Sequence, residues 1–208
     1  MALTIFFSLD VEASGPVPGI FSLLAIGCCV VVDDGSEARV LDGAENEFKV
    51  LVKPLEGARI DEQALLFAGG LVPAELAVTG TAPREALMQL NDWVDRVKTT
   101  AGANRFHFLA HAASFDWMYM RWYYEAMEVP CPFGFAGIDI KAFAMGSLGI
   151  PWEETAKDAL GRRVGLEAVD PLRLHEPLYD AHYQARLFST LLNNRRRLAT
   201  MMEQRKAE

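Results

Sequence analysis

From Thr4 to Glu12 the chain reads TIFFSLDVE, a short stretch that combines a predicted strand with two carboxylates. Residues 4–11 are rich in β-branched and aromatic side chains, which predicts a buried strand. Asp10 and Glu12 lie two residues apart at its end, so their side chains point to the same face. Carboxylates held close together repel each other, and one takes up a proton unless a cation intervenes. By itself the pair leaves two interpretations open: a site for a hard cation such as Mg²⁺ or Mn²⁺, or two solvated side chains at a strand end.

The remaining elements are predicted from hydrophobic periodicity and turn signals. Further apolar runs predict strands at 23–32 and 46–52, and the short connections make these three strands an antiparallel meander. The helix predicted at 83–98 carries one apolar stripe, formed by Ala86, Leu87, Leu90, Trp93, Val94 and Val97. Other helices are expected at 61–68, 114–127 and 177–197, with two short helical pieces within 141–160 and strands at 106–110 and 137–140.

Strands followed by an alternation of strands and helices predict an α/β fold. The expected architecture is a mixed five-stranded sheet, in which a meander of three antiparallel strands is joined by parallel strands and flanked by helices. No repeat or low-complexity linker interrupts the chain, so residues 1–208 are predicted to form a single domain. Hydrophobic residues make up 51% and charged residues 23%, which excludes disorder as the main state.

The net charge and the cysteine spacing argue against several classes of protein. A net charge of -8 argues against a protein that coats long nucleic acids, because such binding depends on Lys and Arg. No stretch approaches the roughly 20 apolar residues of a membrane-spanning helix, and no basic leader precedes the first strand. The three cysteines, Cys28, Cys29 and Cys131, have neither disulfide nor zinc spacing. We expect buried thiols and a cytoplasmic protein.

Two further acidic motifs strengthen the cation interpretation. In AHAASFDWMYM, Asp116 falls in the first turn of a predicted helix, where the helix dipole favours an anion. In HEPLYD, His175 precedes the last helix and Asp180 lies about one turn inside it. Both side chains are therefore expected to face one cleft, His175 from a loop and Asp180 from a rigid element.

Taken in order, DVE in the first strand, FD at a helix start and a final HxxxxD resemble the DEDD superfamily of 3′→5′ exonucleases. The histidine five residues before the last aspartate is similar to the DEDDh branch, which includes oligoribonuclease, ribonuclease T and polymerase proofreading subunits. The resemblance spans residues 10–188 and implies a ribonuclease H-like fold with a two-metal hydrolysis that uses Mg²⁺ or Mn²⁺.

The resemblance also implies a role for each residue of these motifs. Asp10, Glu12 and Asp180 would hold the metal that carries the attacking water, and Asp10 would bridge to a second metal with help from Asp116. His175 would be the general base. The chemistry is consistent, because two cations can clamp the attacking and leaving oxygens and an imidazole can accept the proton of water.

The same resemblance suggests where the substrate lies. Backbone amides of Ala13 and Ser14 are expected to hold the 3′-terminal nucleotide, and His111 and Phe115 to approach it. The chain departs from the usual HNxxFD motif by reading HAASFD, with Ala112 in place of asparagine, which removes one polar contact near the site.

Other aromatic and basic residues allow two interpretations each. The helix predicted at 114–127 has an aromatic and methionine face formed by Phe115, Met118, Tyr119 and Trp122. Its run WMYMRWYY is predicted to be core rather than a base-stacking surface. His107 and His182 are expected to have structural or surface roles. The run at residues 195–197 could contact phosphates or complement a helix C-terminus, and Arg162 and Arg163 could lie near the cleft or on the surface.

These observations predict a metal-dependent 3′–5′ exonuclease that releases nucleoside 5′-monophosphates from short or single-stranded nucleic acid, with RNA slightly favoured over DNA. A homodimer is expected from the resemblance alone. One alternative is a nucleic-acid-binding module that kept the fold and lost catalysis. Another is an endonuclease of the ribonuclease H type, whose sites also contain clustered carboxylates.

Overall fold

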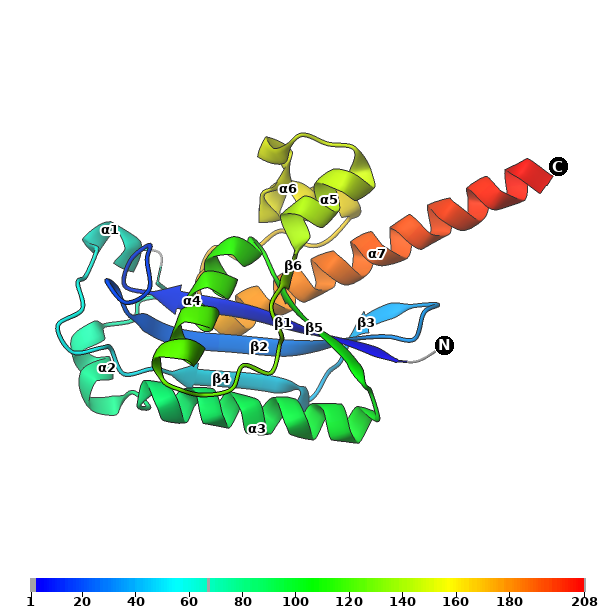
Figure 1. Ribbon diagram of the computed structural model, residues 1–208. Coiled ribbons are helices and arrows are strands. Elements are labelled where there is room, and N and C mark those ends of the chain that lie inside the picture. The colour runs from blue at the N-terminus through cyan, green and yellow to red at the C-terminus, as the bar shows by residue number, and fades with distance from the viewer. Residues whose placement is uncertain (1–2, 67, 208) are drawn as a thin grey trace.

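The computed structural model describes residues 3–66 and 68–207, and its centre is a twisted mixed sheet (Figure 1). Among the described residues the sheet contains six strands: β1 (Thr4–Ala13), β2 (Leu23–Asp33), β3 (Ala38–Val40), β4 (Glu47–Leu51), β5 (Arg105–Ala110) and β6 (Gly137–Asp139). β2 runs antiparallel to β1, and β3 and β4 both pair with the outer edge of β2. β5 is parallel to β1, and β6 is parallel to β5. The sheet is therefore five positions wide, in the order β3-β2-β1-β5-β6, which confirms the predicted class.

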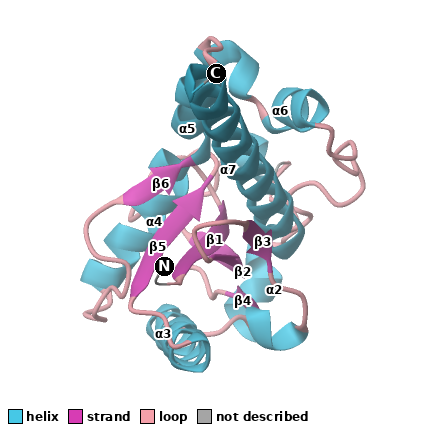
Figure 2. Ribbon diagram, turned by 90° about the vertical axis from the view of Figure 1, so that its right-hand side faces the viewer, coloured by secondary structure: helices cyan, strands magenta, loops and turns pink. Residues whose placement is uncertain are grey.

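Helices cover both faces of this sheet (Figure 2). The helices are α1 (Glu62–Leu65), α2 (Pro73–Thr79), α3 (Pro83–Ala101), α4 (Ala113–Ala126), α5 (Ile140–Leu148), α6 (Lys157–Val164) and α7 (Pro177–Ala207), with short 3-10 turns at Ala44–Asn46 and Trp152–Thr155. One core cluster joins β1 and β2 to α3 and α4, and another joins the opposite face to α5, α6 and α7. The part of α7 beyond the sheet projects from the body of the molecule (Figure 1).

The alternation of side chains along β1 assigns its residues to these two layers. Phe7 and Leu9 belong to the α3–α4 layer, whereas Phe6 packs in the layer of α7. Asp10 and Glu12 share the parity of Phe6, so both lie on the α7 side of the sheet. This placement brings them near the first turn of α7.

Most predicted elements are confirmed, with differences at the ends. The six stripe residues of α3 are all buried. β3 and α2 were not predicted from the sequence, and α7 continues to Ala207, about ten residues beyond its predicted end. The helix predicted at 61–68 is limited to Glu62–Leu65, and residue 67 lies outside the described residues.

The predicted buried face of α4 is partly wrong. Its buried side chains include Tyr123 and Tyr124 besides Tyr119, whereas Phe115 is 37% exposed. Aromatic residues surround this helix, so periodicity alone could not select the face. Burial is possible because the hydroxyls find partners: Tyr119 donates to the Gly15 carbonyl at 2.5 Å, and the Tyr123 hydroxyl accepts from the backbone N–H of Leu23 at 2.8 Å. The prediction that the run is mainly core is confirmed.

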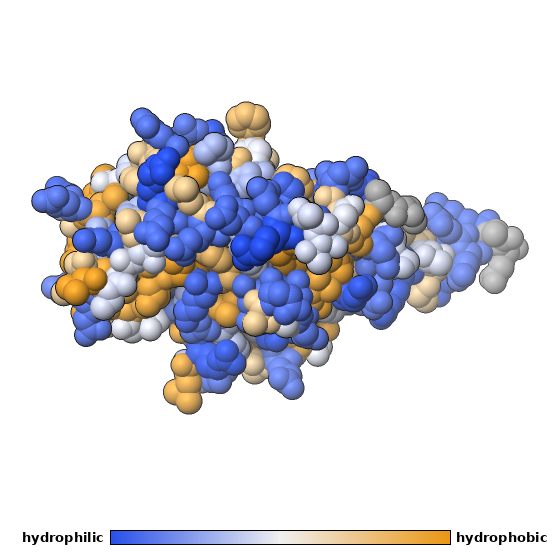
Figure 3. Space-filling model, turned by 90° about the horizontal axis from the view of Figure 1, so that it is seen from below, coloured by the Kyte–Doolittle hydropathy of each residue, from blue (hydrophilic) through white to orange (hydrophobic). Residues whose placement is uncertain are grey.

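The arginines of α7 lie within the helix rather than at its end. Arg196 forms a two-pronged ion pair with Asp33 at the end of β2, with N···O distances of 2.8 and 2.7 Å. The helix does not end at residues 195–197, which corrects the expectation that these arginines complement a helix C-terminus, and Arg196 binds a carboxylate instead. Figure 3, which views the molecule from the α3 side, shows the projecting part of α7 largely covered by hydrophilic side chains.

The remaining general expectations concern thiols and membranes. All three cysteines are free; Cys28 and Cys29 are buried and Cys131 is half-buried. Within the described residues, no helix has the length and apolar character needed to cross a membrane.

Candidate active site

Two buried hydrogen bonds hold the end of β1 against the start of α7. The Ser8 hydroxyl donates to the Ala181 carbonyl at 2.8 Å, and the Gln184 amide donates to the Leu9 carbonyl at 2.8 Å. Gly27 of β2 completes the contact, since a Cβ there would overlap the backbone of Pro177. The first turn of α7 therefore lies directly on the sheet, and Asp180 in that turn faces the carboxylates of β1.

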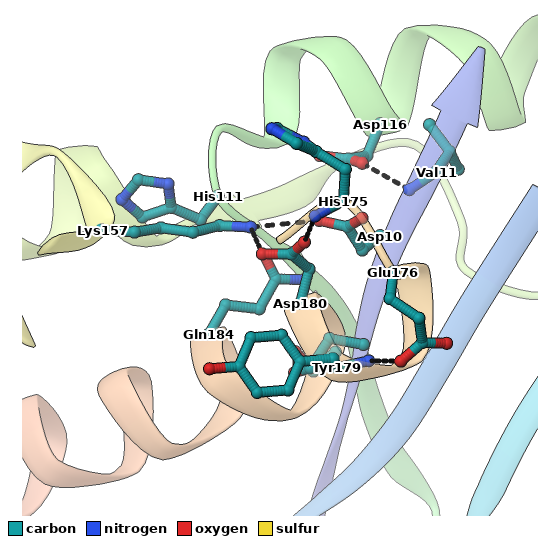
Figure 4. Close-up of polar contacts among 12 residues, drawn as sticks. Asp10, Val11, His111, Asp116, Lys157, His175, Glu176, Tyr179, Asp180 and Gln184 are labelled. Carbon is teal, nitrogen blue, oxygen red and sulfur yellow. Dashed lines mark hydrogen bonds and ion pairs between the residues drawn. The ribbon is translucent and has the colours of Figure 1, made fainter. Parts of the chain in front are cut away.

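Four carboxylates meet at this junction: Asp10, Glu12, Asp116 and Asp180, exposed by 8%, 6%, 4% and 2% respectively. They border a cavity of about 570 Å³. The close-up in Figure 4 shows Asp10 and Asp116 near β1 and α4, with Asp180 reaching toward them from α7. The structure thus brings together all the acidic residues that the sequence motifs predicted.

Asp116 is fixed by a hydrogen bond to β1. Its Oδ1 accepts from the backbone N–H of Val11 at 2.9 Å, as the dashed line in Figure 4 marks. The residue lies in the first turn of α4, as predicted. This bond ties the N-terminus of α4 to the strand between Asp10 and Glu12, so the carboxylates of two elements keep a set spacing.

His175 lies in the loop just before α7, also as predicted. Its backbone adopts a left-handed conformation with φ of 64°, and its N–H donates to Asp180 Oδ2 at 2.7 Å. Gly69 touches the same residue from the other side, because a Cβ there would overlap the His175 carbonyl oxygen. The loop therefore presents the imidazole to the cavity from a backbone held on two sides.

One group of side chains has the spacing of metal ligands. Ligand atoms of Glu12, His175 and Asp180 all lie within 4.8 Å of one another. Two carboxylates and one imidazole suit a divalent ion that accepts oxygen and nitrogen donors. Asp10, which the resemblance implied as a ligand, lies outside this group and forms an ion pair that the sequence did not indicate.

Lys157, the first residue of α6, extends into the acidic cluster. Its Nζ lies 2.8 Å from Asp180 Oδ1 and 3.3 Å from Asp10 Oδ1. No sequence signal pointed to this lysine, since it lies far from both aspartates in the chain and begins a short helix. Its position shows that the space between Asp10 and Asp180 accommodates a cation, which supports the fit of this donor set to metal ions.

The buried carboxylates of this cluster need positive charge nearby if all of them are to be ionised. Burial raises the pKa of Asp10 to about 6, although the Lys157 ammonium partly opposes the rise. Burial, together with the charges of Asp10 and Asp180, raises the pKa of Glu12 to about 10. Burial and the neighbouring Asp10 also raise the pKa of Asp116. Without a further cation these groups cannot all be ionised at neutral pH, whereas divalent ions would restore their carboxylate forms.

The residues predicted to contact the substrate have different surroundings. Ala13, His111 and Phe115 line the cavity. Ser14 does not; it is buried and its backbone N–H donates to the Ser22 carbonyl at 2.8 Å. The expectation that the Ser14 amide holds a nucleotide is corrected on this ground, since the bond to Ser22 already uses that donor.

His111 is held by the segment that precedes α6. Its Nε2 lies 2.8 Å from the Thr155 carbonyl oxygen, so this nitrogen carries the proton. Burial, followed by the charge of Lys157, lowers the pKa of His111 to about 4. The ring is therefore neutral at physiological pH and its other nitrogen is left as an acceptor.

The two remaining histidines lie outside the site, in agreement with the sequence analysis. His107 is exposed and its ring packs 5.7 Å from that of Phe6. His182 points away from the cavity, with Nε2 2.8 Å from Glu47 Oε1 on β4. Both histidines therefore contact other side chains of the fold and do not line the cavity.

A mixed sheet of this order, with buried carboxylates at the end of its central strand, defines a metal-dependent nuclease of ribonuclease H-like fold. A family model for exonucleases, RNase_T, matches residues 7–188. The chain belongs to this family, and its histidine five residues before the last aspartate makes it a DEDDh-type 3′–5′ exonuclease. It is thus a hydrolase that depends on divalent metal ions and acts at the ends of nucleic acids.

Individual relatives agree with this assignment. The chain is 33% identical over 184 residues to the 3'-5' DNA exonuclease Cap18 of Escherichia coli, covering 88% of this chain and 89% of the relative. It is 27% identical over 187 residues to ribonuclease T of Vibrio vulnificus strain YJ016, covering 89% and 82%. The nuclease domain of 3'hExo, a DEDDh family member solved with rAMP, superposes with a TM-score of 0.71 at 15% identity and 92% coverage of both chains, which shows the shared fold.

Proposed function

We propose that residues 1–208 act as one exonuclease domain that removes nucleoside 5′-monophosphates from the 3′ end of single-stranded DNA. The observation that carries the proposal is the meeting of Asp10, Glu12, Asp116 and Asp180 with His175 at one cavity. DNA takes precedence over the RNA expected from sequence, because the relative with 33% identity is a DNA exonuclease. RNA is the second candidate, favoured by the likeness to ribonuclease T.

The proposed mechanism assigns the acidic residues to two Mg²⁺ or Mn²⁺ ions. Glu12 and Asp180 would hold one ion together with Asp10, and Asp10 and Asp116 would serve the second. When bound, such ions activate water and stabilise the charge that develops on the phosphate. The residues of the chain contribute the spacing, which the Asp116–Val11 and Gln184–Leu9 hydrogen bonds maintain.

His175 is proposed as the general base. Its loop places the imidazole at the rim of the cavity, within 4.8 Å of ligand oxygens of Glu12 and Asp180. From there a neutral ring can accept the proton of the attacking water and release it to solvent. The same distance would allow the ring to coordinate an ion, so a His175→Gln variant, which keeps a polar side chain without the basic nitrogen, tests the assignment.

Substrate contacts are proposed on the apolar side of the cavity. Phe115 is 37% exposed and Leu174 equally so, and both line the cavity. An aromatic face stacks on any base, which suits an enzyme that removes nucleotides regardless of sequence. The backbone of Ala13 and the ring of His111 are the proposed polar contacts.

The decisive assay is a time course on matched DNA and RNA oligonucleotides labelled at the 5′ end, in Mg²⁺ or Mn²⁺. We expect stepwise shortening from the 3′ end, faster on DNA, and loss of at least about 10³-fold in rate for Asp180→Asn and about 10²-fold or more for His175→Gln. Asp92→Asn and His107→Ala, which change exposed residues, are the matched controls. A wild-type protein without activity would favour the binding module, and cleavage of a circular substrate would favour the endonuclease.

Two further expectations from the sequence, the homodimer and the cellular compartment, also remain proposals. A homodimer would appear as twice the chain mass in solution scattering. A reducing compartment such as the cytoplasm is consistent with three free cysteines.

A further inference from the structure

Lys157 is the only lysine or arginine among the cavity-lining residues that the structure describes, and the mechanism proposed above gives it no role. Its Nζ forms ion pairs with Asp180 at 2.8 Å and Asp10 at 3.3 Å, as the dashed lines of Figure 4 show. The lysine side chain is 20% exposed, and the two carboxylates are 11% and 3% exposed. Such a pair is largely shielded from solvent, so its charges interact more strongly than those of a surface ion pair.

The backbone that carries Lys157 is well anchored. Thr155, two residues earlier, is fully buried and its carbonyl binds His111. Gly161, one turn later, packs so closely on the Tyr183 hydroxyl that a Cβ would overlap it. The start of α6 is thereby fixed beside the cavity, whereas the four-carbon stem of the lysine can rotate. The ammonium can leave the carboxylates without any movement of the helix.

The ammonium and a full set of divalent ions compete for the same ligands. Glu12 and Asp180 present carboxylate oxygens within 4.8 Å of each other while Lys157 is in place, and Asp180 uses only its Oδ1 for the ammonium. Asp10, however, is the residue proposed to serve both ions, and its Oδ1 is held by the ammonium. Two divalent ions and one ammonium within this cluster would also repel one another at short range.

Resting on the function proposed above, we propose that Lys157 is a built-in counter-ion of the acidic centre: it occupies the position of one cation between Asp10 and Asp180 and must leave before the second divalent ion binds. It thus stabilises the cluster before metal arrives and weakens the affinity for the second ion. The first ion binds beside it, at Glu12 and Asp180, and gains Asp10 when the lysine leaves. Lys157 is therefore a residue that sets metal affinity rather than one that touches the substrate.

Calorimetric titration of Mn²⁺ into the full chain, without nucleic acid, tests the inference. We expect two binding steps for the wild type and a second step tighter by roughly tenfold or more for Lys157→Met, because a unit charge next to a divalent ion is removed. Lys157→Arg should retain a weak second step. The matched control is Lys141→Met, since the Lys141 ammonium lies over the Trp152 ring, 4.4 Å from its centroid.

A second measurement uses the unaltered protein, so it does not depend on a variant that folds. Acetylation by an amine-reactive ester, followed residue by residue with mass spectrometry, should be slow at Lys157 in the presence of a chelator. It should accelerate on addition of Mn²⁺, while Lys141 stays unchanged.

The outcomes separate this inference from the function on which it rests. If the wild type binds Mn²⁺ but Lys157→Met gives the same second affinity, or if Mn²⁺ leaves the acetylation of Lys157 unchanged, Lys157 is not the counter-ion. If the wild type binds no Mn²⁺ at all, the proposed metal site fails and the inference fails with it.

Discussion

Replacement of Glu12 by glutamine is expected to stabilise the protein in the absence of divalent ions while it removes exonuclease activity. Glu12 is 6% exposed and lies beside other acidic groups. Glutamine has nearly the same shape but no charge to bury. The variant therefore removes an electrostatic cost of the metal-free cluster and, at the same time, a proposed metal ligand.

The size of the effect follows from the pKa of Glu12, which burial first, and then Asp10, raise from 4.5 to about 10. At neutral pH the folded protein must hold a proton on Glu12 that the unfolded chain releases. The interval from 4.5 to pH 7, at about 1.4 kcal/mol per pH unit, corresponds to a cost of about 3 kcal/mol. A gain of this size would raise the melting temperature by roughly 6–12 °C in a domain of this length.

The sign of the pH dependence is fixed by the raised pKa. Below pH 4.5 the carboxyl is protonated in both states, so Glu12 imposes no penalty and the variant should match the wild type. As the pH rises from 4.5 toward 10 the unfolded chain alone loses its proton, and the wild type becomes progressively less stable. The advantage of Glu12→Gln must therefore grow between pH 4.5 and 7.

Urea unfolding followed by circular dichroism, in the presence of a chelator, measures this difference. Glu56→Gln, at an exposed loop position, is the matched control and should change the free energy of unfolding by less than about 0.5 kcal/mol. Added Mg²⁺ should stabilise the wild type more than the variant, because only the wild type has the full ligand set. The reasoning is refuted if Glu12→Gln is no more stable than the wild type at pH 7 in chelator.

Three further substitutions test how the site is held together. Gly27→Ala should lower the free energy of unfolding by about 1–3 kcal/mol in urea titrations, since its Cβ would overlap the Pro177 backbone; unchanged stability would contradict the close contact. Gly69→Ala, at φ of 58°, should displace the loop of His175 and reduce kcat about tenfold or more while the fold remains cooperative; full kcat would refute the role of this contact. Arg196→Met should cost about 1 kcal/mol or less, because the guanidinium is partly exposed; loss of activity without loss of stability would instead indicate a substrate contact.

The sequence was sufficient for the parts of the fold that depend on local periodicity. The stripe of α3 repeats at helical spacing, and β1 is rich in β-branched and aromatic residues before Asp10, so both elements were predicted with nearly correct bounds. The buried face of α4 was not predicted correctly, because aromatic residues occur on all sides of this helix and only tertiary contacts select which of them are buried. β3 escaped prediction because three residues contain too little periodicity.

The acidic side chains of the site were predictable for a different reason. Residues two apart on a strand share a face, and a residue in the first turn of a helix faces the preceding strand end, so local geometry limits where Asp10, Glu12 and Asp116 can point. No such local geometry determines where the Lys157 side chain points. Its approach to Asp180 depends on the packing of α6 against α7, and a single lysine at a helix start has the same local pattern as any solvated one.

The position of Lys157 also bears on how an acidic protein holds nucleic acid. With a net charge of -8, the chain gives no general attraction to phosphate. Among the described residues that line the cavity, Lys157 is the only lysine or arginine, and Asp10 and Asp180 already engage it. Phosphate groups in the cavity must therefore rely on divalent ions, while the proposed stacking of a base on Phe115 adds an uncharged contact. Substrate affinity should then depend steeply on divalent ions and weakly on monovalent salt, because few basic side chains are available to release counter-ions from the nucleic acid. Such an enzyme is expected to bind the last few nucleotides and to make few contacts with the rest of the strand.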